Sequence, residues 1–261
     1  MIALFESGNT ILHFSWWDGT AIKEPVKNPY PDSSGSLRSI VSNLLGVTKY
    51  HSATIPEKVA ACSVSLKWRT PLFEAINDIV PGRLVVARTA LDLGIKVSYD
   101  KPETYGIDRA LAAYAAFRMF QNSCVVVDAG TAVTVDAVAS DGTVIGGYIF
   151  PGSDMLADVL SSKTDLPMVS LGEVSEGIGD GVSFCNSTMT GITFGISMGF
   201  SAAVNQLIKN AMKIAESDDR VVITGGGAES LKQSLAFPAY HKPHMVLEAL
   251  GLVAEILPKY T

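Results

Sequence analysis

Two short segments of the chain combine an acid, a glycine and a hydroxyl or amide side chain in the same order. Glu6–Thr10 reads Glu-Ser-Gly-Asn-Thr, and Asp128–Ala132 reads Asp-Ala-Gly-Thr-Ala. Each follows a short apolar run, Ile2–Phe5 or Cys124–Val127. Glycine lets the backbone approach an anion closely, a threonine hydroxyl adds a donor, and a carboxylate suits a cation or a metal-bound water. Two such loops facing each other across a cleft would hold a polyphosphate and its metal, which is the chemistry of a phosphotransferase.

A third glycine cluster follows another apolar run. Thr224–Ala228 reads Thr-Gly-Gly-Gly-Ala and comes directly after Val221–Ile223, which has the composition of a buried strand. Ligands of open α/β sheets bind beyond the carboxyl ends of the strands. Three glycines are a weak signal by themselves, but they follow a strand as the two acidic loops do. We therefore expect Gly225 and Gly226 to lie near the base or ribose of a nucleotide.

An acid and an arginine, Asp108 and Arg109, stand side by side where a helix is expected to begin. The helix dipole alone would explain a carboxylate in a first turn. The apolar periodicity places Ile107, Ala110 and Leu111 on the inner face, so that Asp108 and Arg109 are expected on a polar face. A carboxylate can accept a hydroxyl proton, and a guanidinium can grip a carboxylate. The pair therefore suits phosphate transfer to an anionic alcohol.

The elements that carry these residues follow one order twice: three strands, then alternating helices and strands. After the first apolar run, strands are expected at Ile11–Trp17, Ala21–Val26, Val59–Cys62, Leu84–Ala87, Ile95–Tyr99, Ser123–Asp128, Ala132–Val138, Thr143–Phe150 and Val221–Ile223. Helices are expected at Leu37–Leu45, Pro71–Asp78, Ile107–Ala115 and Val246–Leu257. The sequence therefore predicts a duplicated α/β domain with a cleft between the copies.

The composition excludes several classes of protein. Of 261 residues, 48% are hydrophobic and 18% charged, which argues against disorder. A net charge of −6 argues against a nucleic-acid partner. Cys62, Cys124 and Cys185 are widely spaced, so we expect buried thiols in a reducing compartment. Because Glu6 interrupts the first apolar run, no secretory leader is expected, and we expect a cytoplasmic protein.

One long segment, Gly181–Ile208, contains no charged residue. Gly191, Gly195 and Gly199 recur at every fourth position, a spacing that lets two helices approach closely. The segment also carries many serine, threonine and amide side chains, which makes it too polar for lipid. We therefore expect no membrane contact, and a helix buried either in the domain core or at a subunit contact.

Together, the motifs resemble those of the type III pantothenate kinases, a family of the acetate kinase, sugar kinase and actin-like superfamily. The matching pieces span nearly the whole chain in the family's order: Ser7–Thr10, Tyr99–Pro102, Tyr105–Arg109, Asp128–Asp136, Gly146–Gly152, Asn186–Thr188 and Thr224–Gly226. Each piece is weak alone, but their joint occurrence is specific. The resemblance implies ATP-dependent phosphorylation of pantothenate to 4'-phosphopantothenate, the first step of coenzyme A biosynthesis.

The resemblance also implies roles for individual residues. Asp108 would be the general base on the pantothenate hydroxyl. The substrate would be lined by Tyr99, Gly106, Ile107, Asp108, Arg109 and Thr188. ATP would contact Glu6, Ser7, Gly8, Asn9, Thr10, Ile11, Leu12, His13, Gly130, Thr131, Gly225 and Gly226. Asp128 would help hold a monovalent cation, K⁺ or NH₄⁺, and Glu6 would help hold Mg²⁺.

The fold implied by the resemblance is a pair of ribonuclease H-like (actin-like ATPase) domains, with mixed sheets and flanking helices. We expect a first domain over residues 1–118, with the first phosphate loop and the base, and a second over 119–261, with the other loops and a dimer helix. In that family two subunits complete each site, so a homodimer is expected.

Two positions depart from the family's pattern. The first loop normally begins with aspartate, and the extra methylene of Glu6 moves its carboxylate by ~1.5 Å, which would disturb octahedral Mg²⁺ geometry. Some members carry lysine where this chain has His13, and a neutral imidazole would offset phosphate charge less well. Two alternatives therefore stay open: a nucleotide-binding regulator with impaired catalysis, and another small-molecule kinase of the superfamily.

Overall fold

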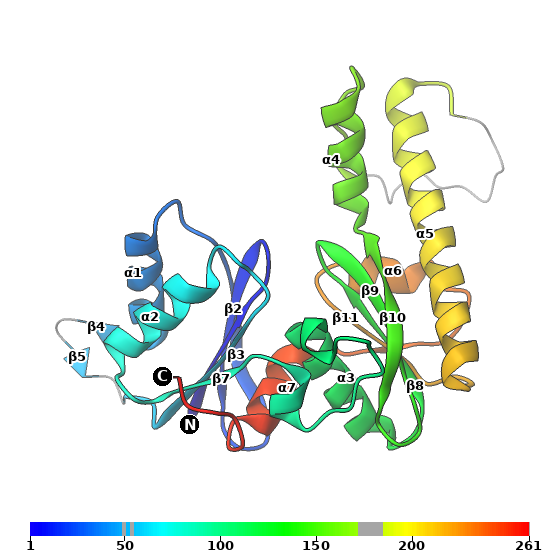
Figure 1. The fold of residues 1–261 in the computed structure, drawn as a ribbon. Coiled ribbons are helices and arrows are strands. Elements are labelled where there is room, and N and C mark those ends of the chain that lie inside the picture. The colour runs from blue at the N-terminus through cyan, green and yellow to red at the C-terminus, as the bar shows by residue number, and fades with distance from the viewer. Residues whose placement is uncertain (49–50, 53–54, 172–184, 261) are drawn as a thin grey trace. The chain divides into compact units, whose positions relative to one another are not determined.

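The computed structural model describes residues 1–48, 51–52, 55–171 and 185–260. The chain divides into two compact units. The first unit comprises Met1–Ser123, Val138–Gly146 and His244–Thr261, and the second comprises Cys124–Ala137 and Gly147–Pro243. Two five-stranded sheets, one for each half of the sequence repeat, form the framework of the chain (Figure 1).

The first sheet has the strand order β3-β2-β1-β6-β7. Its strands are β1 (Ile2–Ser7), β2 (Ile11–Trp17), β3 (Ile22–Pro29), β6 (Lys58–Ser63) and β7 (Leu84–Ala87). β1 pairs antiparallel with β2 and parallel with β6. Ala3, Leu4 and Phe5 are all fully buried, because β1 lies in the middle of the sheet and is covered on both faces.

Helices of the first unit pack in two pairs beside this sheet (Figure 1). α1 (Ser34–Leu44) packs on α2 (Arg69–Ile79), and both share a core with Phe5 and Phe14. α3 (Ile107–Phe120) packs on α7 (Met245–Val253), and α7 lies against β1 and β2. The apolar stripes of these helices thus cover the continuous apolar runs of the central strands.

The second sheet has the order β10-β9-β8-β11-β12, which is the same arrangement as in the first sheet. Its strands are β8 (Cys124–Ala129), β9 (Ala132–Val138), β10 (Val144–Pro151), β11 (Val221–Thr224) and β12 (Tyr240–His241). The helices of this unit are α4 (Ser153–Lys163), α5 (Thr188–Ala215) and α6 (Ala228–Gln233). The predicted duplication of an α/β domain is therefore confirmed.

Several short elements have no counterpart in the prediction. They are the two-residue strands β4 (Val47–Thr48) and β5 (His51–Ser52), and the 3₁₀ turns η1 (Ala90–Leu93) and η2 (Pro102–Thr104). The predicted strand Ile95–Tyr99 is wrong, since this segment forms only an isolated bridge between Val97 and Val144. Backbone hydrogen bonds join only Lys96 and Ser98 of this segment to Val144.

The predicted division into residues 1–118 and 119–261 is also wrong, because the last helix belongs to the first unit. α7 lies so close to β2 that a Cβ on Gly251 would come within 2.5 Å of the Trp17 ring. The glycine permits this approach, and the helix thereby closes one face of the first sheet. The turn around Val138–Gly146 also belongs to the first unit, through the bridge to Val97.

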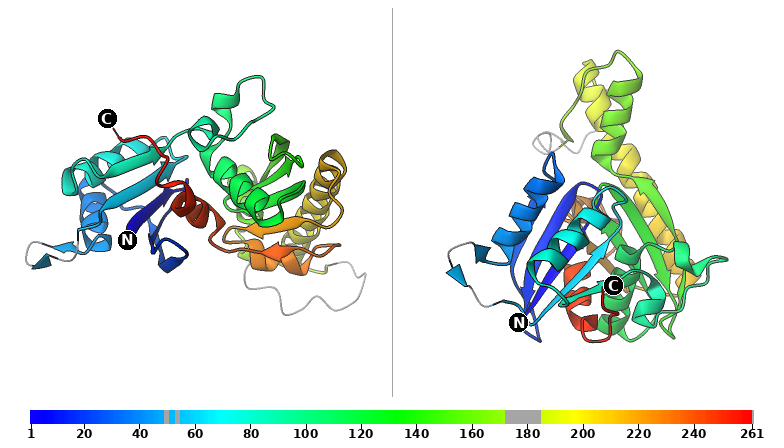
Figure 2. Two further views of the ribbon diagram at one scale, coloured as in Figure 1. Left: turned by 90° about the horizontal axis from the view of Figure 1, so that it is seen from below. Right: turned by 60° about the vertical axis from the view of Figure 1, so that its left-hand side comes forward.

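The uncharged segment forms most of α5, which runs beside α4 (Figures 1 and 2). Gly181 and the three residues after it lie outside the described residues. A Cβ added at Gly191, Gly195 or Gly199 would meet nothing within 4 Å, and all three glycines are exposed. The glycine face of α5 is therefore not buried in the domain core, which removes one of the two expected placements.

Candidate active site

The first loop joins β1 to β2 through a tight turn. The Gly8 amide donates to the Ile11 carbonyl (N···O 3.1 Å), and Asn9 and Thr10 are exposed at the tip. The prediction placed backbone amides of this loop against an anion. The N–H of Gly8 is instead used to close the turn, so phosphate contacts must come from the groups at the tip.

The two residues that depart from the family's pattern lie next to each other. Glu6 and His13 are direct partners in the β1–β2 register, and Glu6 Oε2 is 3.3 Å from His13 Nδ1. The side chains are 17% and 26% exposed, so both remain accessible to a ligand. The carboxylate expected to hold Mg²⁺ is thus also the neighbour of the imidazole expected near phosphate.

The predicted base stands at the beginning of α3. Gly106 precedes the helix, and Asp108 lies in its first turn, half-buried. Asp108 Oδ1 accepts a hydrogen bond from the Arg109 amide (2.8 Å). A Cβ on Gly106 would lie 2.6 Å from the same oxygen, so Gly106 leaves the space in which this carboxylate sits.

The pKa of the Cys62 thiol is affected by two carboxylates of this unit. Cys62 is the register partner of Glu6 in the parallel pair β1–β6. Burial raises the pKa of Cys62 well above its usual value, and the negative charges of Glu6 and Asp108 raise it further. The first unit therefore brings the predicted base and the first-loop acid near one buried strand end, as a phosphotransferase site requires.

Arg109 was expected on a polar face, and this prediction is wrong. Its side chain is only 7% exposed, and its guanidinium lies 4.5 Å from the centroid of the Tyr105 ring. Nη2 donates to the Tyr99 hydroxyl (3.2 Å), and the Tyr99 and Tyr105 rings meet edge to face at 5.2 Å. The segment before α3 folds over the arginine, so Arg109 and Tyr99 do come together, but within an aromatic shell.

The second loop is held by glycine backbone. The Gly130 amide donates to the Ala132 carbonyl (3.1 Å), which closes the turn as Gly8 does in the first loop. Gly152 N donates to Thr131 O (3.1 Å), and Gly227 N donates to Ala129 O (2.8 Å). These bonds place the loop between two other chain segments of the second unit.

Glycines are required at two of these approaches. A Cβ on Gly225, whose φ is +92°, would lie 2.4 Å from Asp128 Oδ1, and one on Gly152 would lie 2.5 Å from Thr131 O. Asp128 is half-buried and Thr131 is exposed. The structure thus brings together the predicted Asp128, Thr131 and Gly225, with Gly226 in the same turn.

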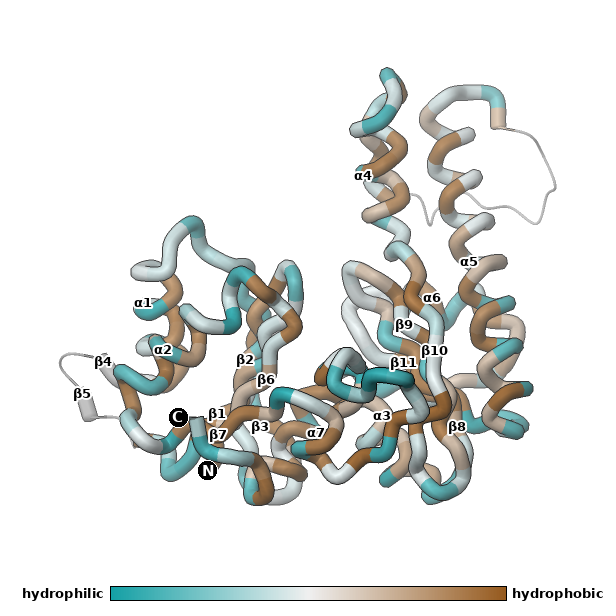
Figure 3. Tube along the Cα trace, in the orientation of Figure 1, coloured by the Kyte–Doolittle hydropathy of each residue, from teal (hydrophilic) through white to brown (hydrophobic). Residues whose placement is uncertain are grey.

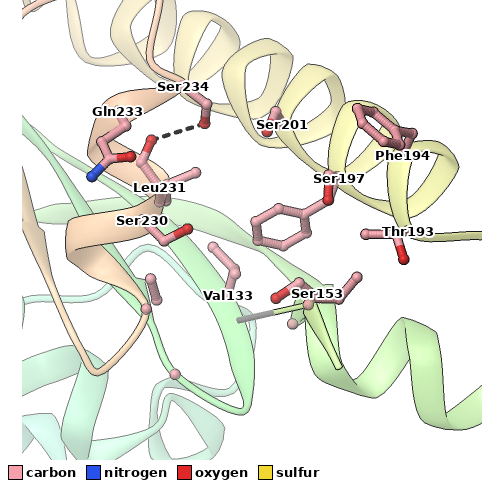
Figure 4. A pocket seen from close by; sticks show the side chains of 16 residues that line it. Val133, Ser153, Thr193, Phe194, Ser197, Ser201, Ser230, Leu231, Gln233 and Ser234 are labelled. Carbon is pink, nitrogen blue, oxygen red and sulfur yellow. Dashed lines mark hydrogen bonds between the residues drawn. The ribbon is translucent and has the colours of Figure 1, made fainter. Parts of the chain in front are cut away.

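A cavity of about 360 Å³ opens beside the second loop (Figure 4). Figure 4 shows side chains from α5 and α6 pointing into it, and none of the described residues that line it is charged. Its wall is made of glycines, hydroxyls, four aliphatic side chains, two phenylalanines and an amide: Ala129, Gly130, Val133, Gly152, Ser153, Leu171, Thr193, Phe194, Ser197, Phe200, Ser201, Gly227, Ser230, Leu231, Gln233 and Ser234. An uncharged cavity next to a phosphate loop has the chemistry to accept a base and ribose.

The carboxylates near the two loops suit a metal ion that is bound together with the phosphates of a nucleotide. Among the residues that the structure describes, no three His, Cys, Asp or Glu side chains gather into a metal cage. Mg²⁺ in kinases needs only one or two carboxylates besides phosphate oxygens and water. Glu6 and Asp128, each half-buried near the end of a strand, have carboxylate oxygens for the ions expected at them, Mg²⁺ at Glu6 and a monovalent cation at Asp128.

Sequence reasoning missed three groups of the first unit. Tyr30 and Ser63 bind the first loop through hydrogen bonds to Ser7 Oγ, at 2.6 Å and 2.9 Å. His244 precedes α7, and burial lowers its pKa, with the charge of Lys27 adding to the effect. All three are distant from the loop in sequence, and no local pattern marks them.

The duplicated sheets and their glycine loops define an α/β protein of the actin-like ATPase and sugar-kinase fold. A structure described as a Baf family transcriptional activator from Campylobacter jejuni matches with a TM-score of 0.59 and 18% identity over 97% of each chain. A ROK hexokinase from Thermus thermophilus matches with a TM-score of 0.51 and 11% identity over 98% of each chain. These likenesses show the fold.

Sequence similarity goes further than the fold. The profile of the family described as type III pantothenate kinase matches residues 2–210. A type III pantothenate kinase of Persephonella marina is 33% identical over 257 residues, which cover 96% of each chain. The chain belongs to the type III pantothenate kinase family and is a kinase.

Proposed function

We propose that this kinase transfers the γ-phosphoryl group of ATP to the hydroxyl of pantothenate, giving 4'-phosphopantothenate and ADP, the first step of coenzyme A biosynthesis. The observation that carries the proposal is the group at the start of α3 in a chain of this family. A half-buried carboxylate, Asp108, stands beside Arg109 and Tyr99, which are bonded to each other. This group supplies a base and donors for an anionic alcohol.

In the proposed reaction Asp108 accepts the hydroxyl proton as the hydroxyl oxygen attacks the γ-phosphorus, and the bond to the ADP oxygen breaks. Phosphoryl transfer needs positioning and charge neutralisation more than covalent chemistry. Arg109 and Tyr99, with Thr188 at the start of α5, would orient pantothenate. The backbone at Gly106 and Ile107 would complete the wall.

We propose that the cavity and both glycine loops each contribute to nucleotide binding. The 360 Å³ cavity would take the base and ribose beside Gly225 and Gly226, and Thr131 would contact phosphate. The first loop, from Glu6 to His13, would contact the phosphates, with Mg²⁺ near Glu6 and K⁺ or NH₄⁺ near Asp128. Mg²⁺ and the monovalent cation would offset phosphate charge.

The test is ADP release by the purified protein with and without pantothenate, in potassium and in sodium buffers. We expect release to depend on pantothenate and to be faster in potassium. Nucleotide binding without release would instead favour a regulatory homologue, and release driven by another small alcohol would favour a different kinase of the superfamily.

We propose that the chain forms a homodimer through the exposed glycine face of α5. Met198 on this helix is 69% exposed, and Figure 3 shows white and brown tube along the middle of the helix. By length and composition α5 could also cross a membrane, but one such helix is weak evidence for a membrane span. A partner helix on Gly191, Gly195 and Gly199 would cover these residues in a cytoplasmic enzyme.

Light scattering should give about twice 27.7 kDa for the parent chain. A Cβ at Gly195 meets nothing in the chain itself, so Gly195→Leu should fold but dissociate, whereas Gly35→Leu, also open in the chain and away from α5, should stay dimeric. A monomeric parent chain with full activity, or a chain found only in membranes, would contradict this part of the proposal.

A further inference from the structure

A chain of hydrogen bonds joins the first loop to residues at the ends of neighbouring strands. Ser63 Oγ donates to Ser7 Oγ (2.9 Å), Ser7 Oγ lies 2.6 Å from Tyr30 Oη, and Tyr30 Oη donates to the Gly8 carbonyl (3.0 Å). Ser63 Oγ itself accepts from the Ser65 amide (3.2 Å). We call Ser63, Ser7 and Tyr30 the hydroxyl chain.

The direction of the hydroxyl chain follows from its proton count. Each hydroxyl has one proton to donate. Because Tyr30 gives its proton to the Gly8 carbonyl, the bond between Ser7 and Tyr30 must be donated by Ser7. Burial raises the pKa of Tyr30 to about 12, so this proton is present at neutral pH. The protons of Ser7 and Tyr30 therefore both run towards Gly8, and the proton of Ser63 is shared between Ser7 Oγ (2.9 Å) and the Ser65 carbonyl (3.3 Å). Such chains strengthen each bond.

Both the ring and the hydroxyl of Tyr30 are fixed. Tyr30 follows the last residue of β3, and its ring stacks on Trp68 with centroids 4.9 Å apart and planes 7° from parallel. Ser7 and Ser63 are the last residues of β1 and β6 and are partners in their register. Three strands of the sheet thus support one carbonyl oxygen in the first loop.

The consequence concerns the peptide group that joins Gly8 to Asn9. In a trans peptide the C=O and the N–H point in opposite directions. Tyr30 draws the Gly8 carbonyl inward, so the Asn9 N–H of the same peptide group faces away from the sheet, towards the exposed tip of the loop. A flip of this peptide would turn a carbonyl oxygen towards the tip, which would repel an anion.

We propose that Tyr30 is a positioning residue for the nucleotide: through its bond to the Gly8 carbonyl it aims the Asn9 N–H at a phosphate oxygen. This inference rests on the proposed function only in taking the first loop as a phosphate loop. It does not depend on pantothenate being the acceptor.

Tyr30→Phe tests the inference, because it removes the hydroxyl and keeps the ring that stacks on Trp68. The dissociation constant for Mg·ADP and KM for ATP should each rise about 10-fold, the usual effect of one lost hydrogen bond. KM for the acceptor should stay unchanged. Tyr260→Phe is the matched control, since Tyr260 packs against the same core on the Phe73 ring, and it should leave all three constants unchanged.

A double-mutant cycle distinguishes the hydroxyl chain from separate contacts. Ser63→Ala removes the first donor and should weaken Mg·ADP binding less than Tyr30→Phe does. Combined with Tyr30→Phe it should add little, because both act through one chain. If Tyr30→Phe is too unstable to study, Ser63→Ala and its effect on Mg·ADP binding still decide the question.

The direct readout is the amide signal of Asn9 in protein labelled with ¹⁵N-asparagine. Mg·ADP should shift this signal strongly in the parent chain and weakly in Tyr30→Phe. The inference is overturned if Tyr30→Phe binds Mg·ADP with unchanged affinity. It is also overturned if Mg·ADP does not shift the Asn9 amide signal in the parent chain. Absence of pantothenate phosphorylation with normal Mg·ADP effects would instead count against the proposed function alone.

Discussion

The two glycine loops occupy the same place in two sheets of the same strand order, yet different chemistry holds them. The first loop is supported by side chains, the hydroxyls of Ser7, Tyr30 and Ser63. The second loop is supported by backbone, at Gly152 and Gly225, where there is no space for a Cβ. The two copies therefore share the tight turn and its acid, but the contacts that stabilise the turn differ between them. The two loops should therefore respond differently to substitution.

The largest expected effect concerns the base, which only the first unit carries. Asp108→Asn should lower kcat by about 10² to 10⁴, the usual contribution of a positioned base, while nucleotide and pantothenate binding persist. Steady-state kinetics and calorimetry measure the two effects. Glu103 is an exposed acid shortly before α3, so Glu103→Gln is the control and should leave kcat unchanged. Undiminished turnover by Asp108→Asn would remove Asp108 from the mechanism.

The next largest effect comes from adding a Cβ to a glycine beside the second loop, compared with the same change in the first loop. Gly225→Ala would force a Cβ to within 2.4 Å of Asp128 at a positive φ, which should cost about 1–3 kcal/mol and weaken Mg·ADP binding by about 5- to 150-fold. At Gly8 a Cβ would lie 3.3 Å from the Ile11 carbonyl, so Gly8→Ala should cost less. Calorimetric titration of both variants checks the order. The reverse order would show that the first loop, not the second, is the tightly packed one.

An intermediate effect is expected at the pair that distinguishes the first loop from the family's pattern. Glu6 and His13 are 3.3 Å apart, so replacing either alone breaks a matched pair. Glu6→Asp and His13→Lys should each raise KM for ATP, and the double variant should recover about 10-fold of the combined loss. Purely additive effects would show that the two departures are independent. In each single variant, activity measured with Mn²⁺ should fall less than activity measured with Mg²⁺, because the coordination of Mn²⁺ is less exacting.

The smallest effect separates buried from exposed thiols. Burial raises the pKa of Cys62 well above its usual range and that of Cys124 to about 12, so neither forms thiolate at pH 8. Cys185 is exposed. Iodoacetamide should therefore alkylate Cys185 first in the native protein, and mass spectrometry of tryptic peptides would show it. Rapid labelling of Cys62 would mean that the first loop opens far more than its hydrogen bonds indicate.

Much of the fold was predictable because apolar periodicity is a local signal. The strand at Leu84–Ala87 was predicted with the observed bounds, and the strand at Ile11–Trp17 was also predicted as observed. The return of α7 to the first sheet was not predictable, because periodicity identifies an apolar face and not the sheet that it covers. The acids Glu6 and Asp128, the glycine loops and Asp108 could be proposed from the sequence because their residue types alone indicate phosphate, metal or proton chemistry.

The rest of the site depends on contacts between distant residues. Tyr30 lies 23 positions from Ser7, and Ser63 lies 56 positions from it. Arg109 was placed on a polar face because helix periodicity ignores Tyr99 and Tyr105, which fold back over it. These residues become functional candidates only when the sheet order and the approach to α3 are known.

The most direct test of the account is the identity of the phosphorylated product. The purified chain is incubated with ATP, Mg²⁺, K⁺ and pantothenate, and the mixture is analysed by mass spectrometry. The account predicts pantothenate carrying one added phosphoryl group, formed in equal amount to ADP by the parent chain and nearly absent with Asp108→Asn. ADP formed without phosphorylated pantothenate, or no turnover while both ligands bind, would contradict it.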